Sequence, residues 1–237
     1  MKTPFFPSLR PCLAPMGSRT GAAAASLTQA TLLQIEERLS PALDPTLLQK
    51  PAKKAHSRTR IFSLTRTFWC WMWQVLQGNT SCREVVRQVQ ALFAVFTDAE
   101  VDERTSAYCR ARKKLACGLL EKAFGSSHRS AEKHAAASQL LQGRPLKMVD
   151  GSGLRVSDTP ENRKAFPSSK NQYDKPSFPI MKIVALFSAA SGAILAKATG
   201  SFLQSELRLL MSLRQGLHPN DILGGTVISA ALSWPPG

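Results

Sequence analysis

The stretch from Leu146 to Gly153 constrains the fold more than any other, because it joins an apolar run to an aspartate and two glycines. The apolar residues before Asp150 predict a short buried strand. Gly151 and Gly153 favour a turn directly after that strand, since glycine adopts backbone conformations closed to other residues. We therefore expect Asp150 at the tip of the strand. Taken alone, an aspartate before a glycine favours a simple turn over a site.

The hydropathy pattern downstream alternates between strand-like and helix-like periods. Residues 179–187 and 192–200 are apolar runs of strand length, and residues 203–217 carry apolar side chains at helical spacing. A further strand begins at Asp221. The succession of strand, strand, strand, helix and strand predicts an α/β domain over residues 146–237.

The preceding part of the chain is predicted to be helical. Apolar residues recur at helical spacing in residues 31–39, 61–77, 81–96, 107–115 and 119–141. Ser81 with Glu84 matches the capping-box pattern, and Thr105 or Ser106 is the candidate cap of the next helix. Gly78 and Gly118 are expected to end helices.

The tryptophans of this helical part have two possible roles, and the segments on either side of it are expected to lack regular structure. Trp69, Trp71 and Trp73 could stack on nucleic-acid bases, but aromatic residues on a helical stripe favour core packing, which we expect here. Residues 1–30 are rich in proline and alanine and predict a tail without regular structure. The linker at residues 142–145 separates the helical region from the α/β domain.

The chain is strongly basic. It has 31 Lys and Arg residues against 16 Asp and Glu residues, a net charge of +15 and a pI of about 10.1. Such an excess favours a polyanionic partner, with nucleic acid ahead of an anionic membrane surface. A basic surface with no partner is the alternative that composition leaves open.

Two basic segments are candidate DNA contacts. The first contains Lys53, Lys54, Arg58 and Arg60, and the second contains Arg110, Arg112, Lys113 and Lys114. The first segment fits a solvated linker as well as a phosphate-binding arm. The second lies on the later of two consecutive helices, as in a helix-turn-helix, although the connection is longer than the usual tight turn. A basic helix packed on its apolar side is the other reading.

The cysteines and the hydropathy indicate in which cellular compartment the protein is expected. The five cysteines form no C-x-x-C pair, which favours reduced thiols in a cytoplasmic protein. Cys70 and Cys82 fall within apolar helical patterns and are expected in the core. The longest apolar run is shorter than the ~20 residues that span a bilayer, so no membrane partner is expected.

Several strings in this sequence occur in the order found in one enzyme family. They are Val149-Asp150-Gly151-Ser152, residues 158–162, Phe178-Pro179 with the following apolar run, residues 186–188, residues 191–193, Ser205-Glu206-Leu207 and Asp221-Ile222-Leu223. Over roughly residues 61–223 the chain resembles the DDE transposases of bacterial insertion sequences, in the insertion sequence four family. The resemblance implies fold class α+β, with a helical DNA-binding region at 31–141 and an incomplete ribonuclease-H-like domain at 146–237.

The resemblance also implies a chemistry. Asp150 would be the first of three carboxylates that hold two Mg²⁺ or Mn²⁺ ions about 3.5–4 Å apart. Such ions stabilise the attacking and leaving oxygens of phosphoryl transfer, which is how these enzymes cleave and rejoin DNA. The implied partner is double-stranded DNA carrying the terminal inverted repeats of the element. Whether the protein forms a homodimer is left open by the sequence.

The sequence departs from the family after Leu223. Gly224, Gly225, Thr226 and Val227 stand where the family continues Leu-Ala-Asp-Arg with its second catalytic aspartate. The glutamate that serves as third carboxylate has no counterpart here. Codons for residues 226–231, read with the preceding base in frame, can encode Asp-Arg-Tyr-Phe-Cys-Ser, which is the family continuation. We therefore expect a frameshift and a catalytically incomplete chain.

Three functions follow for testing. The first is a DDE transposase, and the second is a non-catalytic DNA-binding protein derived from one. The third is a nucleotide-binding α/β protein that uses Gly151-Ser152-Gly153 as a phosphate loop. The third is the least favoured, because an isolated Gly-x-Gly lacks the remaining glycine and the strand-to-helix context.

Overall fold

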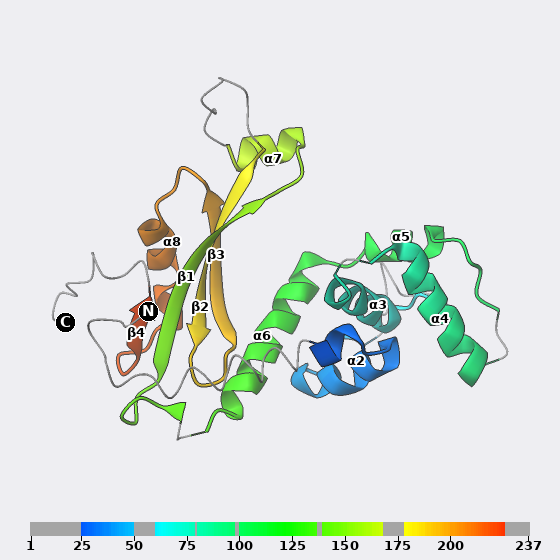
Figure 1. Cartoon of the computed structure of the whole chain (residues 1–237), viewed down its shortest axis with the longest axis horizontal. Coiled ribbons are helices and arrows are strands. Elements are labelled where there is room, and N and C mark those ends of the chain that lie inside the picture. The colour runs from blue at the N-terminus through cyan, green and yellow to red at the C-terminus, as the bar shows by residue number, and fades with distance from the viewer. Residues whose placement is uncertain are drawn as a thin grey trace. The chain divides into compact units, whose positions relative to one another are not determined.

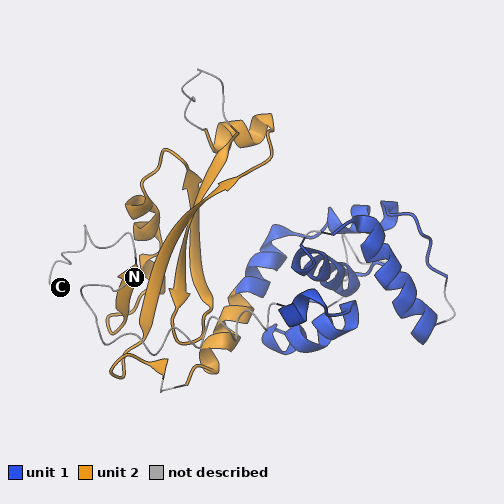
Figure 2. Cartoon of the chain, in the orientation of Figure 1, with its two compact units in different colours: residues 1–124 blue, residues 125–237 orange. Residues whose placement is uncertain are grey.

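A computed structural model describes residues 25–49, 60–78, 80–97, 100–136, 139–167 and 178–225. The chain forms two compact units, residues 1–124 and residues 125–237 (Figure 2). The division falls inside the helix Cys117–Lys133.

The first unit is helical, as the periodicity predicts. Its elements are α2 (Leu32–Leu39), the 3-10 turn η1 (Ser40–Ala42), α3 (Leu64–Leu76), α4 (Cys82–Phe96), α5 (Ser106–Arg112) and the first part of α6 (Cys117–Lys133). No helix in the described part of the chain is long and apolar enough to cross a membrane.

Side-chain caps fix where the first three of these helices begin. Thr31 and Gln34 form a reciprocal capping box at α2. The hydroxyl of Ser63 accepts from the Arg66 N–H at α3. That of Ser81 accepts from the Glu84 N–H at α4, which is one half of the predicted capping box. Each such cap contributes about 1 kcal/mol, because it satisfies a backbone donor that has no partner within the helix.

The helix boundaries around α5 differ from the prediction. Thr105 precedes α5 but its side chain makes no capping hydrogen bond. The chain leaves the helix at Lys113, whose N–H donates to the carbonyls of Cys109 and Ala111. Gly118 therefore ends no helix and lies in the first turn of α6. Gly78 does end α3 as predicted, with a φ of +67° that favours glycine.

Tryptophans and branched aliphatic residues form the core of the first unit. Trp69 and Trp73 are 2% and 5% exposed, which confirms that they pack in the core. Trp73 Nε1 donates a 2.9 Å hydrogen bond to the carbonyl of Ala30, so its one polar atom is satisfied. Ile35, Val85 and Val89, among other residues, complete this core.

The second unit contains a mixed four-stranded sheet (Figure 1). Its strands are β1 (Leu146–Arg155), β2 (Ile180–Ser188), β3 (Ile194–Ser201) and β4 (Ile222–Gly225), in the order β3-β2-β1-β4. β2 pairs antiparallel with both β1 and β3, whereas β4 pairs parallel with β1. The predicted succession of strands, helix and strand is confirmed.

Helix α8 (Glu206–Ser212) covers one face of this sheet. Leu209, Leu210 and Leu213 pack against Val149 and Leu186 in the core of the unit. The helix is shorter than the predicted range 203–217. It begins at a cap in which the hydroxyl of Ser205 accepts from the Arg208 N–H, and the 3-10 turn η3 (Arg214–Gly216) follows it.

The connection between β1 and β2 contains a helix in its described part. α7 (Pro160–Ala165) begins with a proline in its first turn, where the missing N–H costs nothing. The Thr159 hydroxyl accepts from the Asn162 N–H, and Arg163 pairs with Asp158. These local contacts explain the helix, which no apolar periodicity indicates.

Candidate active site

The sequence predicts that the first strand ends at Asp150. In the structure, β1 continues past this residue. It continues through Gly151 and Gly153, which pair with Val184 and Lys182 of β2. The glycines are held extended because the neighbouring strand supplies hydrogen-bond partners along this whole stretch. Asp150 therefore lies in the middle of β1 instead of at its tip.

Gly151 has a steric role in place of the predicted turn. A Cβ atom at this position would lie 3.0 Å from Cδ of Glu206 and 3.1–3.2 Å from its carboxylate oxygens. Glu206 is the first residue of α8, and the absence of a side chain at Gly151 lets its carboxylate approach the strand. The sequence contains this pair, but only the packing of α8 on the sheet brings it together.

Asp150 is exposed and lies on the sheet face opposite to α8. Its Oδ1 accepts a 2.9 Å hydrogen bond from the N–H of Gly151. Successive strand residues point to opposite faces, and Val149 packs on the α8 side. The carboxylates of Asp150 and Glu206 therefore belong to opposite faces of the sheet.

Strand β4 lies beside Asp150 on the other edge of β1. The parallel register pairs Leu146 with Ile222 and Val149 with Gly225, so the described ladder stops one residue before Asp150. Parallel strands have their carboxyl ends at the same edge of a sheet. The last described residue of β4, Gly225, consequently lies beside Val149, the residue before Asp150.

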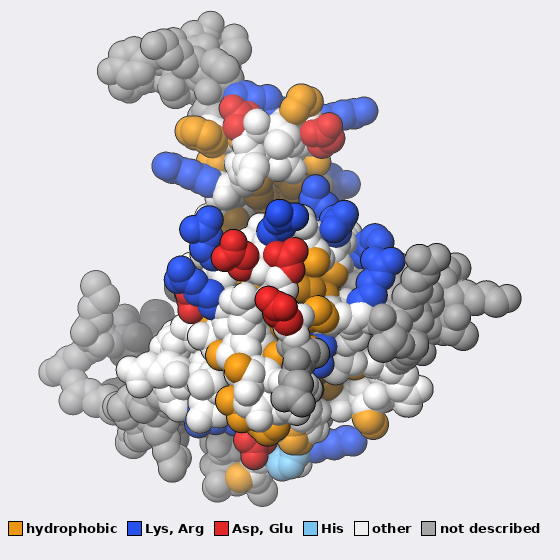
Figure 3. Space-filling view, turned by 90° about the vertical axis from the view of Figure 1, so that its right-hand side faces the viewer, with side chains coloured by type: hydrophobic (Ala, Val, Ile, Leu, Met, Phe, Trp, Pro, Cys, Tyr) orange, Lys and Arg blue, Asp and Glu red, His pale blue; other side chains and the backbone are white. Residues whose placement is uncertain are grey.

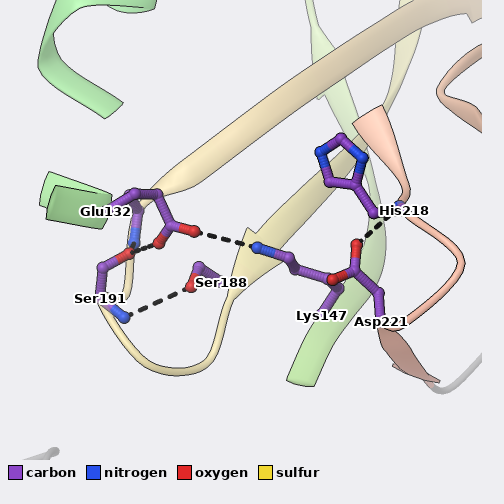
Figure 4. Close-up of polar contacts among 7 residues, drawn as sticks. Glu132, Lys147, Ser188, Ser191, His218 and Asp221 are labelled. Atoms are coloured by element: carbon purple, nitrogen blue, oxygen red, sulfur yellow. Dashed lines mark hydrogen bonds and ion pairs between the residues drawn. The ribbon is translucent and has the colours of Figure 1, made fainter. Parts of the chain in front are cut away.

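Hydrogen bonds around the start of β4 fix this register. The Ile222 N–H donates to the Pro145 carbonyl at 2.8 Å, and Arg144 Nε donates to the Asn220 carbonyl at 3.1 Å. The His218 N–H donates to Asp221 Oδ2 at 2.9 Å and closes the turn before the strand (Figure 4). The start of the predicted fourth strand is thus tied to the linker that precedes β1.

The described residues do not fit a two-metal centre. Among them, no three His, Cys, Asp or Glu side chains are grouped so that they could hold a metal ion. Mg²⁺ gives up its hydration water reluctantly and is bound through carboxylates that share one site. Asp150 supplies one such carboxylate, and Glu206 lies on the other face of the sheet. The predicted role of Asp150 as a metal ligand stays a prediction.

A polar cluster that the sequence did not reveal lies at the start of β1 (Figure 4). Lys147 is 6% exposed, and its Nζ lies 3.0 Å from Glu132 Oε2. The Ser191 hydroxyl donates to Glu132 Oε1 at 2.5 Å. Lys147 occurs within an apolar strand, which is the one signal that could have marked it as a buried ion-pair partner.

The electrostatics of this cluster favour the charged carboxylate. Burial raises the pKa of Glu132, but hydrogen bonds from Ser191, Ser188 and Lys147, with the charge of Lys147, outweigh it. The pKa of Glu132 therefore lies below its usual range. The cluster joins the end of α6 to the first strand and the β2–β3 turn, so we assign it a structural role.

The first unit contains the candidate DNA contacts on α5, and Arg112 differs from its neighbours. Its Nη1 donates to Gln74 Oε1 at 2.9 Å, and its guanidinium carbon lies 5.7 Å from the centre of the Tyr108 ring. The Tyr108 hydroxyl donates to the same Gln74 oxygen at 2.7 Å. Arg112 is thus directed towards α3, and its contacts indicate a structural role.

The remaining basic residues of α5 and of its C-terminal turn face solvent. Arg110, Lys113 and Lys114 are exposed, and Arg110 Nε donates to the Ser106 carbonyl at 3.3 Å. Arg60 is also exposed. The predicted contacts Lys53, Lys54 and Arg58 lie outside the described residues. Figure 3 shows Lys and Arg side chains spread over the face in view, with Asp and Glu side chains among them.

Comparisons with known proteins support one part of the resemblance, the relationship to transposases. No protein-family model matches the chain, and no solved structure matches it. The chain is 27% identical over 157 residues to a protein of Escherichia coli (strain K12) named "Putative transposase InsZ". The match covers 64% of this chain and 50% of that protein, so the chain spans about half the length of this curated relative. The similarity supports a transposase relationship.

Proposed function

We propose that this chain is a DDE-class transposase of the insertion sequence four type that binds duplex DNA and, by itself, cuts no strand. The observation that carries the proposal is the parallel pairing of β4 with β1, which stops one residue before Asp150. In the family pattern, the residue after the fourth strand is the second catalytic aspartate. The last described pair, Val149 with Gly225, directly precedes Asp150 in one strand and position 226 in the other, and this supports the proposal.

The sheet supports the ribonuclease-H-like assignment. The order β3-β2-β1-β4, with α8 between β3 and β4 in the chain, follows the succession that the resemblance implies. The similarity to the E. coli putative transposase supports the transposase part of the proposal, since the match extends over 157 residues.

The charges of the chain support DNA as the partner. A net charge of +15 draws the protein to phosphates, and each cation that neutralises a phosphate releases a counterion. Arg110, Lys113 and Lys114 are exposed on consecutive turns and are the described residues best placed for this role. We extend the proposal to the terminal inverted repeats of the element as the recognised duplex and to a homodimer as the binding form.

Catalytic incompleteness follows from the carboxylates. Phosphoryl transfer depends on positioning and on neutralisation of charge by metal ions. Of the carboxylates in the family pattern, the sequence has Asp150, whereas residue 226 is a threonine where the family has aspartate. The chain would bind DNA without assembling the centre that cleaves it.

Two measurements test this function. Binding is measured by fluorescence anisotropy with a labelled duplex that carries the ends of the element, and cleavage by nicking of the same duplex in Mg²⁺ or Mn²⁺. We expect binding without nicking from the 237-residue chain. A chain read in the shifted frame from codon 226 should nick in a metal-dependent way, and Asp150→Asn in that chain should abolish nicking and leave binding intact.

The proposal is overturned by either of two results. Metal-dependent nicking by the 237-residue chain would show that its carboxylates suffice. A lack of affinity for duplex DNA at low salt would show that its charge serves another purpose.

A further inference from the structure

An apolar hollow lies between α2, α3 and the C-terminal end of α4 in the first unit. It has a volume of about 230 Å³. Its lining consists of four apolar side chains, one threonine and one arginine, namely Leu33, Leu92, Phe93, Phe96, Thr97 and Arg66. Phe93 is buried, whereas Leu33 and Phe96 are 45% and 64% exposed. The hollow is therefore open to solvent between exposed apolar side chains.

The apolar surface continues at the end of α4. Val95 and Phe96 are the last two residues of this helix, and Val95 is 74% exposed. Leu92 precedes them by three and four positions, so it lies on the same side of the helix. Single exposed apolar residues are common, but a group of them around a hollow marks an interaction site. Leu33, Leu92, Val95 and Phe96 together form the α4 patch.

Arg66 is the charged residue among the described lining of the hollow. Its guanidinium carbon lies 4.6 Å from the centre of the Phe93 ring, and its Nη1 donates to the Ile61 carbonyl. Burial raises the pKa of nearby Glu36, and the charge of Arg66 offsets part of that rise. Among the described residues, no ion pair joins Arg66 to a carboxylate. The hollow thus combines apolar walls with a cation that is free to pair with an incoming carboxylate.

Exposed acidic residues follow α4 in this otherwise basic chain. They are Glu100, Asp102 and Glu103, with one exposed cation, Arg104, beside them. Val101 is buried, and its carbonyl accepts a 2.9 Å hydrogen bond from Gln90 Nε2, which fixes this acidic segment beside α4. The chain therefore carries an apolar side chain, Phe96, followed by carboxylates. That pattern is complementary to the hollow with its arginine.

We propose that the α4 patch binds a second copy of this chain, so that Phe96 of each copy enters the hollow of the other and the acidic segment faces the other copy's Arg66. In a two-fold contact the same surface serves both copies, so it must hold both the inserting group and the hollow. The α4 patch meets this condition. The inference rests on the homodimer of the proposed function and specifies its surface.

The charge of the chain favours this location over others. A net charge of +15 makes two copies repel each other, so a contact is favoured where apolar and acidic side chains gather. An aromatic side chain in a pocket that excludes water is the usual centre of such an interface. The exposed cations Arg110, Lys113 and Lys114 are not part of the α4 patch and stay available for DNA.

The test is sedimentation velocity of the full chain over a concentration series, at moderate salt and without DNA. We expect a reversible equilibrium between monomer and dimer. Phe96→Asp should raise the dissociation constant of the dimer at least about 100-fold, because two aromatic anchors are lost at once. Leu203→Asp is the matched control, since Leu203 is 69% exposed but lies in the second unit, and it should leave the constant unchanged.

A second pair of variants tests the charges. Glu100→Lys places a cation opposite Arg66 in each copy and should weaken the dimer at least about tenfold. Glu121→Lys makes the same change of net charge at an exposed position on α6 outside the patch, and it should have a smaller effect. Equal effects of the two variants would overturn the pairing of the acidic segment with Arg66.

The remaining outcomes separate the surface from the proposed function. A dimer that survives both Phe96→Asp and Val95→Asp, or one that Leu203→Asp disrupts equally, would overturn the assignment to the α4 patch. Circular dichroism of each variant shows whether it is folded, and Val95→Asp replaces Phe96→Asp if the latter is not. A monomeric wild-type chain that still binds duplex DNA in the anisotropy assay would overturn the dimer and its surface alone. A dimer without affinity for DNA would support the surface and overturn the proposed function.

Discussion

The hydroxyl of Tyr108 on α5 donates a 2.7 Å hydrogen bond to the side-chain oxygen of Gln74 on α3. Both side chains are buried, and Tyr108 is fully so. The Tyr108→Phe variant leaves the Gln74 oxygen short of one donor and should lower the free energy of unfolding by about 1–2 kcal/mol. Urea denaturation followed by circular dichroism measures the change. An unchanged midpoint would mean that this bond contributes nothing to stability.

Replacing Arg112 should change the stability of the protein, whereas replacing its exposed neighbours should change DNA binding. Arg112→Ala removes the second donor to Gln74 and should destabilise the first unit, with little change in the salt dependence of DNA binding. Replacing Arg110, Lys113 and Lys114 together with alanine should leave stability nearly unchanged. The slope of log affinity against log salt should then fall by about 2–3 in magnitude, at roughly 0.9 for each lost phosphate contact.

Anisotropy titrations between low and moderate salt measure that slope, with Arg112→Ala as the matched control. If the triple variant keeps the wild-type slope, this helix does not contact phosphate. If Arg112→Ala flattens the slope in a folded chain, its predicted role in binding is restored.

Glu132 should make the second unit sensitive to acid. Its folded-state pKa lies below the unfolded value, so its contribution is present above the unfolded pKa and is lost as pH falls through the folded pKa. Stability should therefore fall below about pH 4.5, the ordinary range of a glutamate. Urea midpoints from pH 7 down to pH 3 give the profile, and Glu132→Gln should flatten it.

The same variant should lower stability at neutral pH. Glu132→Gln leaves the buried ammonium of Lys147 without its counter-charge, at a cost of about 1–3 kcal/mol. The double variant Glu132→Gln with Lys147→Met removes both charges and should recover part of that loss. A double variant that is less stable than Glu132→Gln alone would contradict the pairing.

Gly151 and Glu206 should be energetically coupled. Gly151→Ala reduces the conformational freedom of the unfolded chain, which alone favours folding by about 0.4–1 kcal/mol. The new Cβ, however, would crowd the Glu206 carboxylate. We expect the gain to appear only when Glu206→Ala is present as well. A double-mutant cycle on urea unfolding should give a coupling of about 0.5–1 kcal/mol. Additive effects would show that the two side chains do not meet.

The sequence predicts the elements of this protein better than their contacts. The apolar run at 180–187 reads as a strand because its length and its β-branched residues leave few alternatives, and β2 confirms it. Gly151 and Gly153 suggest a turn, yet they lie in a strand because β2 supplies their partners. That outcome depends on pairing between segments about thirty residues apart, which local propensity does not contain.

For the candidate sites too, the sequence predicts residues better than it predicts their contacts. Asp150 became a candidate through the resemblance to the transposase family, because its place before a glycine alone favours a turn. The structure adds that β4 pairs with β1 in parallel up to the residue before Asp150. The basic string around Arg112 suggests four equivalent cations, but Gln74 lies 38 residues away and draws one of them inward. Such partners depend on how helices pack, so charge patterning alone cannot separate a phosphate contact from a structural one.

The sheet order has a consequence for how the protein behaves at high concentration. β3 and β4 are the outermost of the four described strands, and the backbone groups on an outer side can template another strand. Exposed Lys197 lies in the middle of β3, and a charge that must lose its water opposes intermolecular pairing there. β4 offers four residues, among them two glycines, which is a poor template. Charge thus opposes strand addition along β3, and the two glycines make the described part of β4 a poor template, so self-association through these edges should be slow.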